Sequence, residues 1–102
     1  MKCKIIQYLV GKNEKYLELA KECEKINRTY AGLYGYDFVF EYMDEDKVKE
    51  QYGKCTTKEI IAYKIKFMYD HLMKNDCDVL MFIDADAAVS KPQIKIEDLI
   101  DD

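Results

Sequence analysis

Two carboxylates one residue apart, Asp84 and Asp86, follow a short apolar run at residues 79–83. An apolar run this short, with acids at both ends, predicts a buried central strand of a sheet covered on both faces. Two carboxylates held close together repel each other, and a hard divalent cation with oxygen ligands relieves that repulsion. Because residues i and i+2 of an extended segment point the same way, both aspartates are predicted to converge on one ion while Ala85 points aside.

In a second interpretation, the two aspartates are only the polar residues at which a strand passes into a loop, and they bind nothing. The chain has 20 acidic residues and two further acidic triplets of the same form, at 44–46 and 76–78. Those two lie in polar segments and are predicted to be solvated loop acids. Only the third follows an apolar run, and ligands of open parallel sheets bind outside the carboxyl ends of the strands. This position favours a metal that bridges to a phosphate-bearing ligand.

The elements before the aspartate pair are predicted as two strands joined by a helix. Residues 4–10 and 36–42 are rich in aromatic and β-branched residues, which is typical of strands. Between them a helix is predicted to begin at an N-cap, Asn13, and to end at a left-handed Gly35. Its buried face is predicted from residues that recur at three- and four-residue intervals: Tyr16, Leu19, Ala20, Cys23, Ile26, Asn27, Tyr30, Ala31 and Tyr34. Asn27, Tyr30 and Tyr36 are expected to hold this helix against the sheet.

A polar connection and a second helix are predicted next. Residues 43–55 are charged and are predicted to be an exposed connection. The spacing of Thr56 and Glu59 matches a capping box and predicts a helix start, and residues 75–76 are predicted to end this helix. A buried stripe is predicted along it from Ile61, Ile65, Met68 and Leu72. His71 is predicted to lie on the surface, and residues 94–100 to form a short terminal element.

The order strand, helix, strand, helix, strand predicts an α/β fold, a truncated three-layer Rossmann-like parallel sheet of βαβαβ order. Right-handed crossovers predict that the first strand lies between the second and the third. This arrangement places Gln7, Tyr8 and Val10 near the aspartate pair, with a crevice between the two strand ends. At 102 residues the chain is predicted to be one domain, residues 1–102.

Composition narrows the class of protein. With 49% hydrophobic and 35% charged residues the chain is predicted to fold as an ordinary globular domain. A net charge of −4 and a pI of about 5.0 argue against nucleic acid as the main partner. Four widely spaced cysteines and a single histidine argue against a zinc site, and the cysteines are expected to be reduced. No signal peptide or membrane span is recognisable, so a cytoplasmic location is expected.

In the order and spacing of its motifs the chain resembles the nucleotide-sugar half of GT-A glycosyltransferases, most closely family 34, the α-galactosyl, α-mannosyl and xylosyl transferases. The resemblance runs from Ile5 to about Pro92. It is carried by Asn27, Tyr30-Ala31, Gly35-Tyr36-Asp37, Tyr63-Lys64-Ile65, Phe82-Ile83-Asp84-Ala85-Asp86-Ala87 and Pro92.

The resemblance implies a GT-A type fold and a Mn²⁺- or Mg²⁺-dependent transferase. Such an enzyme moves a sugar, with retention, from a nucleoside diphosphate sugar to an acceptor hydroxyl on a glycan or protein that the sequence does not identify. Asp84 and Asp86 are implied to hold the metal against the donor diphosphate. The segment from Gln7 to Gly11, with Tyr8 and Val10, is implied to contact the nucleoside, and Lys64 to face phosphate or sugar. Packing remains an alternative role for Tyr8, and a lysine lying over apolar surface remains one for Lys64.

Two other functions stay open on the sequence. The family continues into a second half that shapes the acceptor site, so a truncated, non-catalytic nucleotide-sugar-binding module is an alternative. Haloacid dehalogenase phosphatases also end a strand in such a pair, but their Thr or Val four residues after the first Asp is Ala88 here. An exposed sheet edge is expected to favour a homo-oligomer, a dimer or larger.

Overall fold

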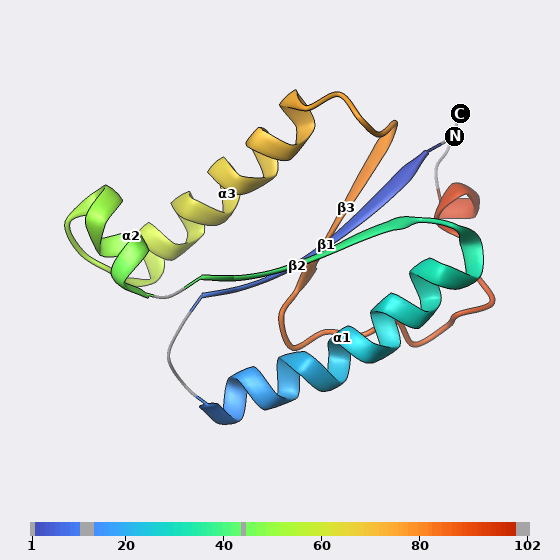
Figure 1. The fold of residues 1–102 in the computed structure, drawn as a ribbon, viewed down its shortest axis with the longest axis horizontal. Helices are drawn as coiled ribbons and strands as arrows, with labels where there is room; N and C mark the ends of the chain where they lie inside the picture. Colours follow the sequence, from blue (N-terminus) through green and yellow to red (C-terminus); the bar gives the residue numbers. More distant parts are fainter. Residues whose placement is uncertain (1, 11–13, 44, 100–102) are drawn as a thin grey trace.

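The computed structural model describes residues 2–10, 14–43 and 45–99. Within them, three parallel strands form one sheet with helices on both faces (Figure 1). The strands are β1 (Cys3–Val10), β2 (Asp37–Met43) and β3 (Val79–Asp84), in the order β2-β1-β3. The predicted α/β class and strand order are therefore confirmed. In the register, Tyr8 of the central strand pairs with Glu41 on one side and Asp84 on the other.

Helix α1 (Glu14–Tyr34) covers one face of the sheet. Cys3 and Ile5 of β1 pack here with Tyr30 and Ala31 of the helix and with Ile83 of β3. The helix ends as predicted at Gly35, whose φ of 72° is left-handed, and the Tyr36 N–H donates to the Ala31 carbonyl at 2.8 Å. The predicted N-cap, Asn13, lies outside the described residues.

The predicted buried face of α1 is too wide. Ala20, Cys23, Asn27, Tyr30 and Ala31 are buried. Tyr16, Leu19 and Ile26 are exposed, at 39%, 49% and 51%. A three-stranded sheet is too narrow to cover the full apolar arc, so residues at its margins stay in solvent.

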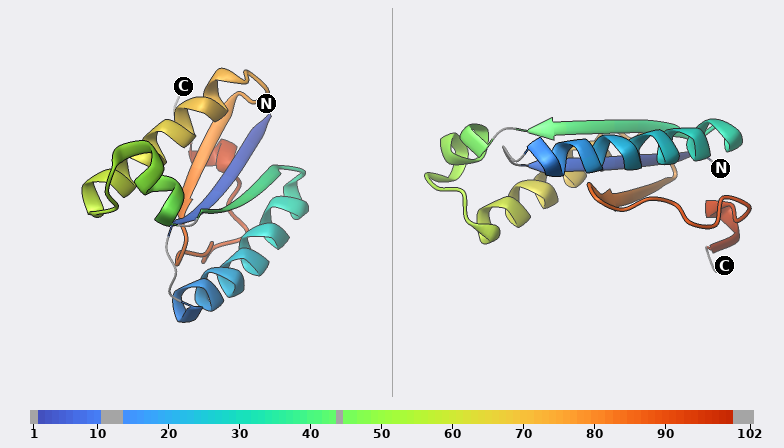
Figure 2. Two further views of the ribbon diagram at one scale, coloured as in Figure 1. Left: turned by 60° about the vertical axis from the view of Figure 1, so that its left-hand side comes forward. Right: turned by 90° about the horizontal axis from the view of Figure 1, so that it is seen from below.

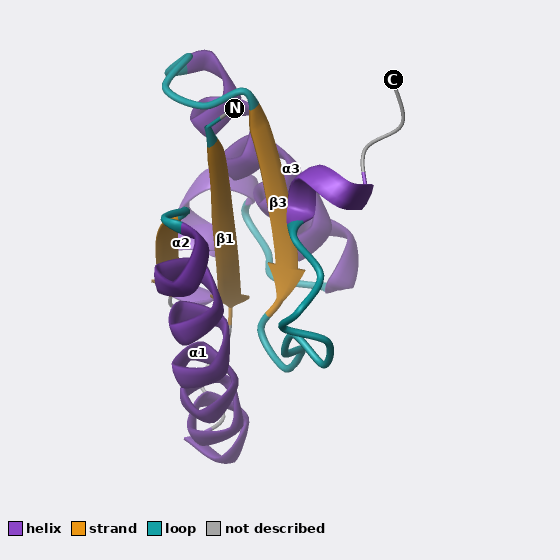
Figure 3. Cartoon of the chain, turned by 90° about the vertical axis from the view of Figure 1, so that its right-hand side faces the viewer, coloured by secondary structure: helices purple, strands orange, loops and turns teal. Residues whose placement is uncertain are grey.

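Helix α3 (Thr57–Met73) lies on the opposite face, as Figures 1 and 3 show. Helix α2 (Glu45–Tyr52) lies beyond the end of β2, beside the start of α3 (Figure 1). The predicted connection at residues 43–55 is exposed as expected over most of its described residues, but the prediction missed the helix α2 within it. Its glutamates, lysines and glutamine favour helix as well as solvent, and Val48 is fully buried. The ring of Tyr52 meets Tyr63 of α3 edge to face at 6.3 Å. The predicted capping box of Thr56 and Glu59 is confirmed at the start of α3.

The predicted buried stripe of α3 is also wrong, because the helix presents a different side to the sheet. Tyr63 and Phe67 pack against Tyr8, with ring centroids 6.3 and 4.7 Å away. His71, predicted to be on the surface, is 7% exposed and meets Phe67 edge to face. Ile61, Ile65 and Leu72 are instead 52%, 61% and 55% exposed. Apolar residues lie on two sides of this helix, and the side that carries the aromatic rings is the one that meets Tyr8.

The segment after β3 turns back along the α1 side of the sheet, as Figure 2 shows in its right-hand view. The Tyr30 hydroxyl donates to the Ile94 carbonyl and the Tyr34 hydroxyl to the Pro92 carbonyl, both at 2.6 Å. A short 3₁₀ helix, η1 (Ile96–Leu99), follows and buries Ile96. The terminal element is thus shorter than predicted, and Ile100 lies outside the described residues.

Candidate metal and donor site

The candidate site lies at the carboxyl end of β3. Asp84 is the last residue of the strand and Asp86 lies in the following turn, and both are exposed. The Ala87 N–H donates to the Asp84 carbonyl at 3.0 Å and closes this turn. The prediction that the pair sits on extended backbone is therefore wrong at Asp86. Ala85 does point aside, since it is 3% exposed and packs with Leu9 and Ala20.

Tyr16, in the first turn of α1, is a member of the site that sequence reasoning missed. Its hydroxyl donates to the Asp86 carboxylate. Burial, and after it the charges of Asp86 and Asp84, raise the pKa of Tyr16 and keep the hydroxyl protonated. Both carboxylates thus lie near enough to Tyr16 for their charges to act on its hydroxyl. The helix that follows a central strand starts at the carboxyl edge of the sheet, and that position is the signal for Tyr16.

Gln7, predicted to contact the nucleoside, is fully buried under α1. Its side-chain nitrogen donates to the Ala20 carbonyl at 3.0 Å and to the Ala85 carbonyl at 2.8 Å. Its oxygen accepts from the Asn27 amide at 3.1 Å. Each polar atom of this side chain is bonded inside the protein, so Gln7 connects the central strand, α1 and the turn of the site.

Asn27 completes this buried network. Its side-chain nitrogen also donates to the Ala87 carbonyl at 3.0 Å, and its oxygen accepts the Val89 N–H at 2.9 Å. The prediction that Asn27 holds α1 against the sheet is confirmed through Gln7. Together Gln7 and Asn27 bind the backbone at Ala85, Ala87 and Val89, so two buried amides fix the loop that carries Asp86.

The remaining predicted donor contacts are placed differently. Tyr8 is fully buried among the rings of Tyr63, Phe67 and Phe82, so packing describes its role and base stacking is not open to it here. Val10 ends β1 and pairs with Met43. Lys64 lies half-buried on α3, and its contact with phosphate or sugar stays a prediction. Gly11 lies outside the described residues.

Asp84 and Asp86 fit a metal ion that is shared with a ligand. Among residues 2–10, 14–43 and 45–99, no group of three or more His, Cys, Asp or Glu side chains could hold a metal ion by itself. Mg²⁺ and similar hard cations are commonly held by one or two carboxylates, with substrate phosphates and water completing the shell. Asp84 and Asp86 are two exposed carboxylates, the number that such an arrangement takes from the protein.

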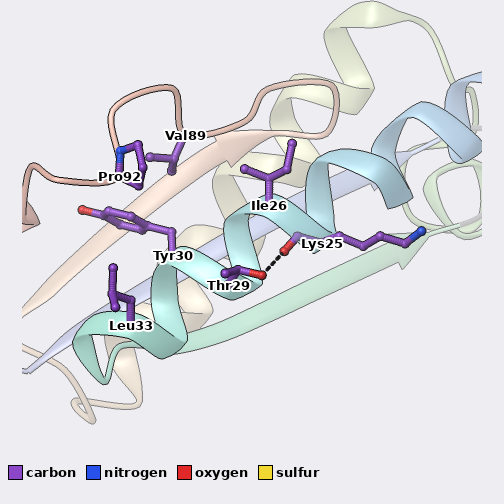
Figure 4. A pocket seen from close by; sticks show the side chains of 7 residues that line it. All are labelled: Lys25, Ile26, Thr29, Tyr30, Leu33, Val89 and Pro92. Carbon is purple, nitrogen blue, oxygen red and sulfur yellow. Dashed lines mark hydrogen bonds between the residues drawn. The ribbon is translucent and has the colours of Figure 1, made fainter.

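Three hollows among the described residues are lined in part by the loop after β3. One, of about 270 Å³, is lined by Asp84, by the preceding strand residues 81–83 and by residues 87–89. It follows the outer edge of β3, whereas the predicted crevice lay between the ends of β1 and β3. On the α1 face those two ends are joined by Gln7 and Ala85. A second hollow, of about 340 Å³, lies between α1 and the loop, where Tyr30 reaches toward Val89 and Pro92 (Figure 4). The third, of about 270 Å³, is lined by residues 88–91 of the loop and by η1.

Comparisons of the chain with protein-family profiles, with curated proteins and with solved structures gave no match. The resemblance to family 34 glycosyltransferases thus remains a prediction from the motifs. Among the described helices, none has the length and apolar character needed to cross a membrane.

Proposed function

We propose that this chain binds the diphosphate of a nucleoside diphosphate sugar through a divalent metal ion at Asp84 and Asp86, as the donor-binding half of a GT-A type glycosyltransferase. The observation that carries the proposal is the exposed aspartate pair at the end of β3, where Asp84 pairs with Tyr8 of the central strand. The carboxyl edge of a parallel sheet is where ligands bind in folds of this class. The motif resemblance supplies the sugar nucleotide as the ligand.

The residues of the site divide into ligands and positioning groups. Asp84 and Asp86 supply the oxygens and the negative charge that a hard cation requires. Tyr16 orients the Asp86 carboxylate by its hydrogen bond. Gln7 and Asn27 fix the loop, so little conformational entropy is lost when the ligand binds.

A bound Mn²⁺ or Mg²⁺ would neutralise the charge that grows on the departing diphosphate. In this proposal the chain orients the diphosphate from the carboxyl edge of the sheet. The acceptor is a glycan or protein hydroxyl. Lys64 is proposed to lie near phosphate or sugar.

The test is a calorimetric titration of the 102-residue chain with UDP-sugars and GDP-mannose, with and without Mn²⁺. We expect binding only with the metal, and a loss of at least about tenfold in affinity for Asp86→Ala, since one charged ligand is removed. Asp98→Ala, which removes an exposed carboxylate on η1, serves as the matched control and should bind as the parent does. Metal-independent binding, or equal binding by Asp86→Ala, contradicts the proposal.

Activity assays separate the alternatives that share this site. Transfer of the sugar to an acceptor, or hydrolysis of the donor, supports the transferase. Metal-dependent binding without either reaction supports a non-catalytic donor-binding module. A beryllium fluoride adduct at Asp84 that mimics an acyl phosphate would instead support a haloacid dehalogenase type phosphatase.

A further inference from the structure

We propose that the last turns of α3 are held on the sheet by a pH-dependent contact, which protonation of the His71 imidazole releases. His71 is the only histidine of the chain. It lies in the last turn of α3, on the side that faces the sheet, and it is 7% exposed. The proposal does not depend on what binds at Asp84 and Asp86.

As a neutral ring, His71 is the third member of a row of rings that joins α3 to the sheet. Tyr63, Phe67 and His71 follow one another at intervals of four residues, so they lie on one side of the helix. The first two rings pack on Tyr8 of β1, and the His71 ring meets the Phe67 ring edge to face, with 4.6 Å between the centroids. A neutral imidazole fits such an apolar row, whereas an imidazolium brings a charge that burial disfavours.

The ring nitrogen Nδ1 of His71 is buried and has no hydrogen-bond partner among residues 2–10, 14–43 and 45–99. In an imidazolium both ring nitrogens are donors, whichever of them carries the proton of the neutral ring. Protonation therefore requires an acceptor at Nδ1, and none lies there among the described residues. A buried donor without an acceptor costs the free energy of its lost hydration, so the cation is accommodated only if the ring moves toward water.

Among the described residues, four charged groups act on the His71 ring. Lys74 at the end of α3 and Lys4 of β1 both repel a cation there. Asp76 and Glu41 attract one, but the two oxygens of Asp76 already accept from Lys4 Nζ, at 2.9 and 2.7 Å. The free carbonyls at the end of a helix also favour a cation, but Lys74 already lies at that end. Burial, and after it Lys74 and Lys4, therefore lower the pKa of His71 below its ordinary value of 6.5.

A histidine with a lowered pKa in the folded chain weakens its own contact in acid. The opened segment takes up the proton first, so the contact is at full strength above the ordinary pKa of 6.5 and weakens as pH falls through the lowered one. Residues 72–76, which follow the ring, are all exposed, so this end of the helix can separate without disturbing buried groups beyond it. The α1 face keeps its bonds, because the amides of Gln7 and Asn27 do not titrate.

The first test follows amide hydrogen exchange by NMR in the 102-residue chain from about pH 7.5 to about pH 5.5, on both sides of the ordinary pKa of histidine. Protection, corrected for the intrinsic pH dependence of exchange, should fall at least about threefold at residues 67–73, within the limit of about tenfold per pH unit for one proton. Protection at residues 5–9 of β1 should not change. No fall at residues 67–73, or an equal fall in both segments, overturns the proposal.

The second test replaces the titrating ring by one that cannot take up a proton. His71→Phe keeps an aromatic ring against Phe67 and should abolish the acid-induced loss of protection at residues 67–73. Tyr69→Phe is the matched control, since Tyr69 is 58% exposed on the same helix, and it should keep the full acid response. An unchanged acid response in His71→Phe overturns the proposal.

The third test leaves His71 in place and changes the charge that faces it. The Cε1 proton of the single histidine reports its pKa by NMR, and Lys4→Met should raise this pKa, because a repelling charge is lost and Asp76 becomes free to pair with the cation. The acid-induced opening should become weaker in the same variant. Lys66→Met removes an exposed lysine from α3 and should change neither quantity. Circular dichroism confirms that each variant is folded, and a pKa of His71 at or above 6.5 in the parent chain overturns the proposal.

Discussion

The two faces of the sheet use different chemistry, although the same central strand supplies both. On the α1 face, Gln7 and Asn27 are buried with their amides bonded, and the Tyr36 hydroxyl donates to Glu97 and accepts the Ile96 N–H. On the α3 face, Tyr8 is buried among aromatic rings. There the Tyr8 hydroxyl and His71 Nδ1 lack a hydrogen-bond partner among the described residues.

This difference separates the parts of the molecule that are positioned by directional hydrogen bonds from the parts that are positioned by nonpolar packing. Hydrogen bonds form only within a narrow range of distances and angles. The bonds from the buried Gln7 and Asn27 amides on the α1 face therefore fix the loop of the candidate site. Aromatic packing tolerates more orientations, and it leaves α3 with an apolar outer face. Substitutions on both faces test this comparison, and the largest effect is expected on the α1 face.

Asn27→Ala should lower the free energy of unfolding by about 3 kcal/mol, because it leaves the Gln7 oxygen, the Ala87 carbonyl and the Val89 N–H without this partner in a buried place. Urea unfolding followed by circular dichroism measures the change. Thr29→Ala on the exposed side of the same helix should change stability by less than about 0.5 kcal/mol. A loss below about 1 kcal/mol for Asn27→Ala would mean that the amide network does not hold the loop.

Removing the same hydroxyl from the two faces should have opposite effects. Tyr36→Phe should cost about 1.5 kcal/mol, since Glu97 and the Ile96 N–H lose their partner. Tyr8→Phe should be neutral or stabilise by up to about 1 kcal/mol, because it removes a buried hydroxyl that has no partner among the described residues. The same unfolding assay compares them, and an equal loss for both would contradict the distinction between the faces.

A pH-dependent effect is expected at the ion pair on the α3 side, where Lys4 donates to both oxygens of Asp76. This hydrogen bond lowers the pKa of Asp76 below its ordinary value of 3.8. As pH falls, the unfolded chain takes up the proton first, so the stabilisation is present above the ordinary pKa and is lost as pH falls through the lowered one.

Asp76→Asn should therefore be less stable than the parent at neutral pH, and the difference should shrink below about pH 4, the ordinary range of an aspartate. Unfolding midpoints measured from about pH 2 to about pH 7, the range over which carboxylates titrate, follow this difference. Asp70→Asn, at an exposed position on α3, is the control. A difference that grows as pH falls would show that the sign is wrong.

The sequence predicted the parts of the fold that depend on local rules. The strand order follows from chirality and from the alternation of strands and helices. Gly35 and the capping box at Thr56 mark helix ends because their backbone chemistry is local. The place of Asp84 at the end of β3 was predicted for the same reason, since an apolar run of that length in this order forms a strand of the sheet.

What the sequence alone determined about this protein is therefore its three strands with the helices α1 and α3, the order of the strands in the sheet and the edge at which Asp84 and Asp86 emerge. Tertiary structure decided which side of α3 faces the sheet, that residues 45–52 form a helix that buries its own Val48, and that Gln7 bonds inward. Tyr16 became part of the site only through the position of α1. The physical reason is that periodicity shows how apolar residues are spaced, whereas the choice between two apolar faces depends on the shape and hydrogen-bonding groups of what they meet.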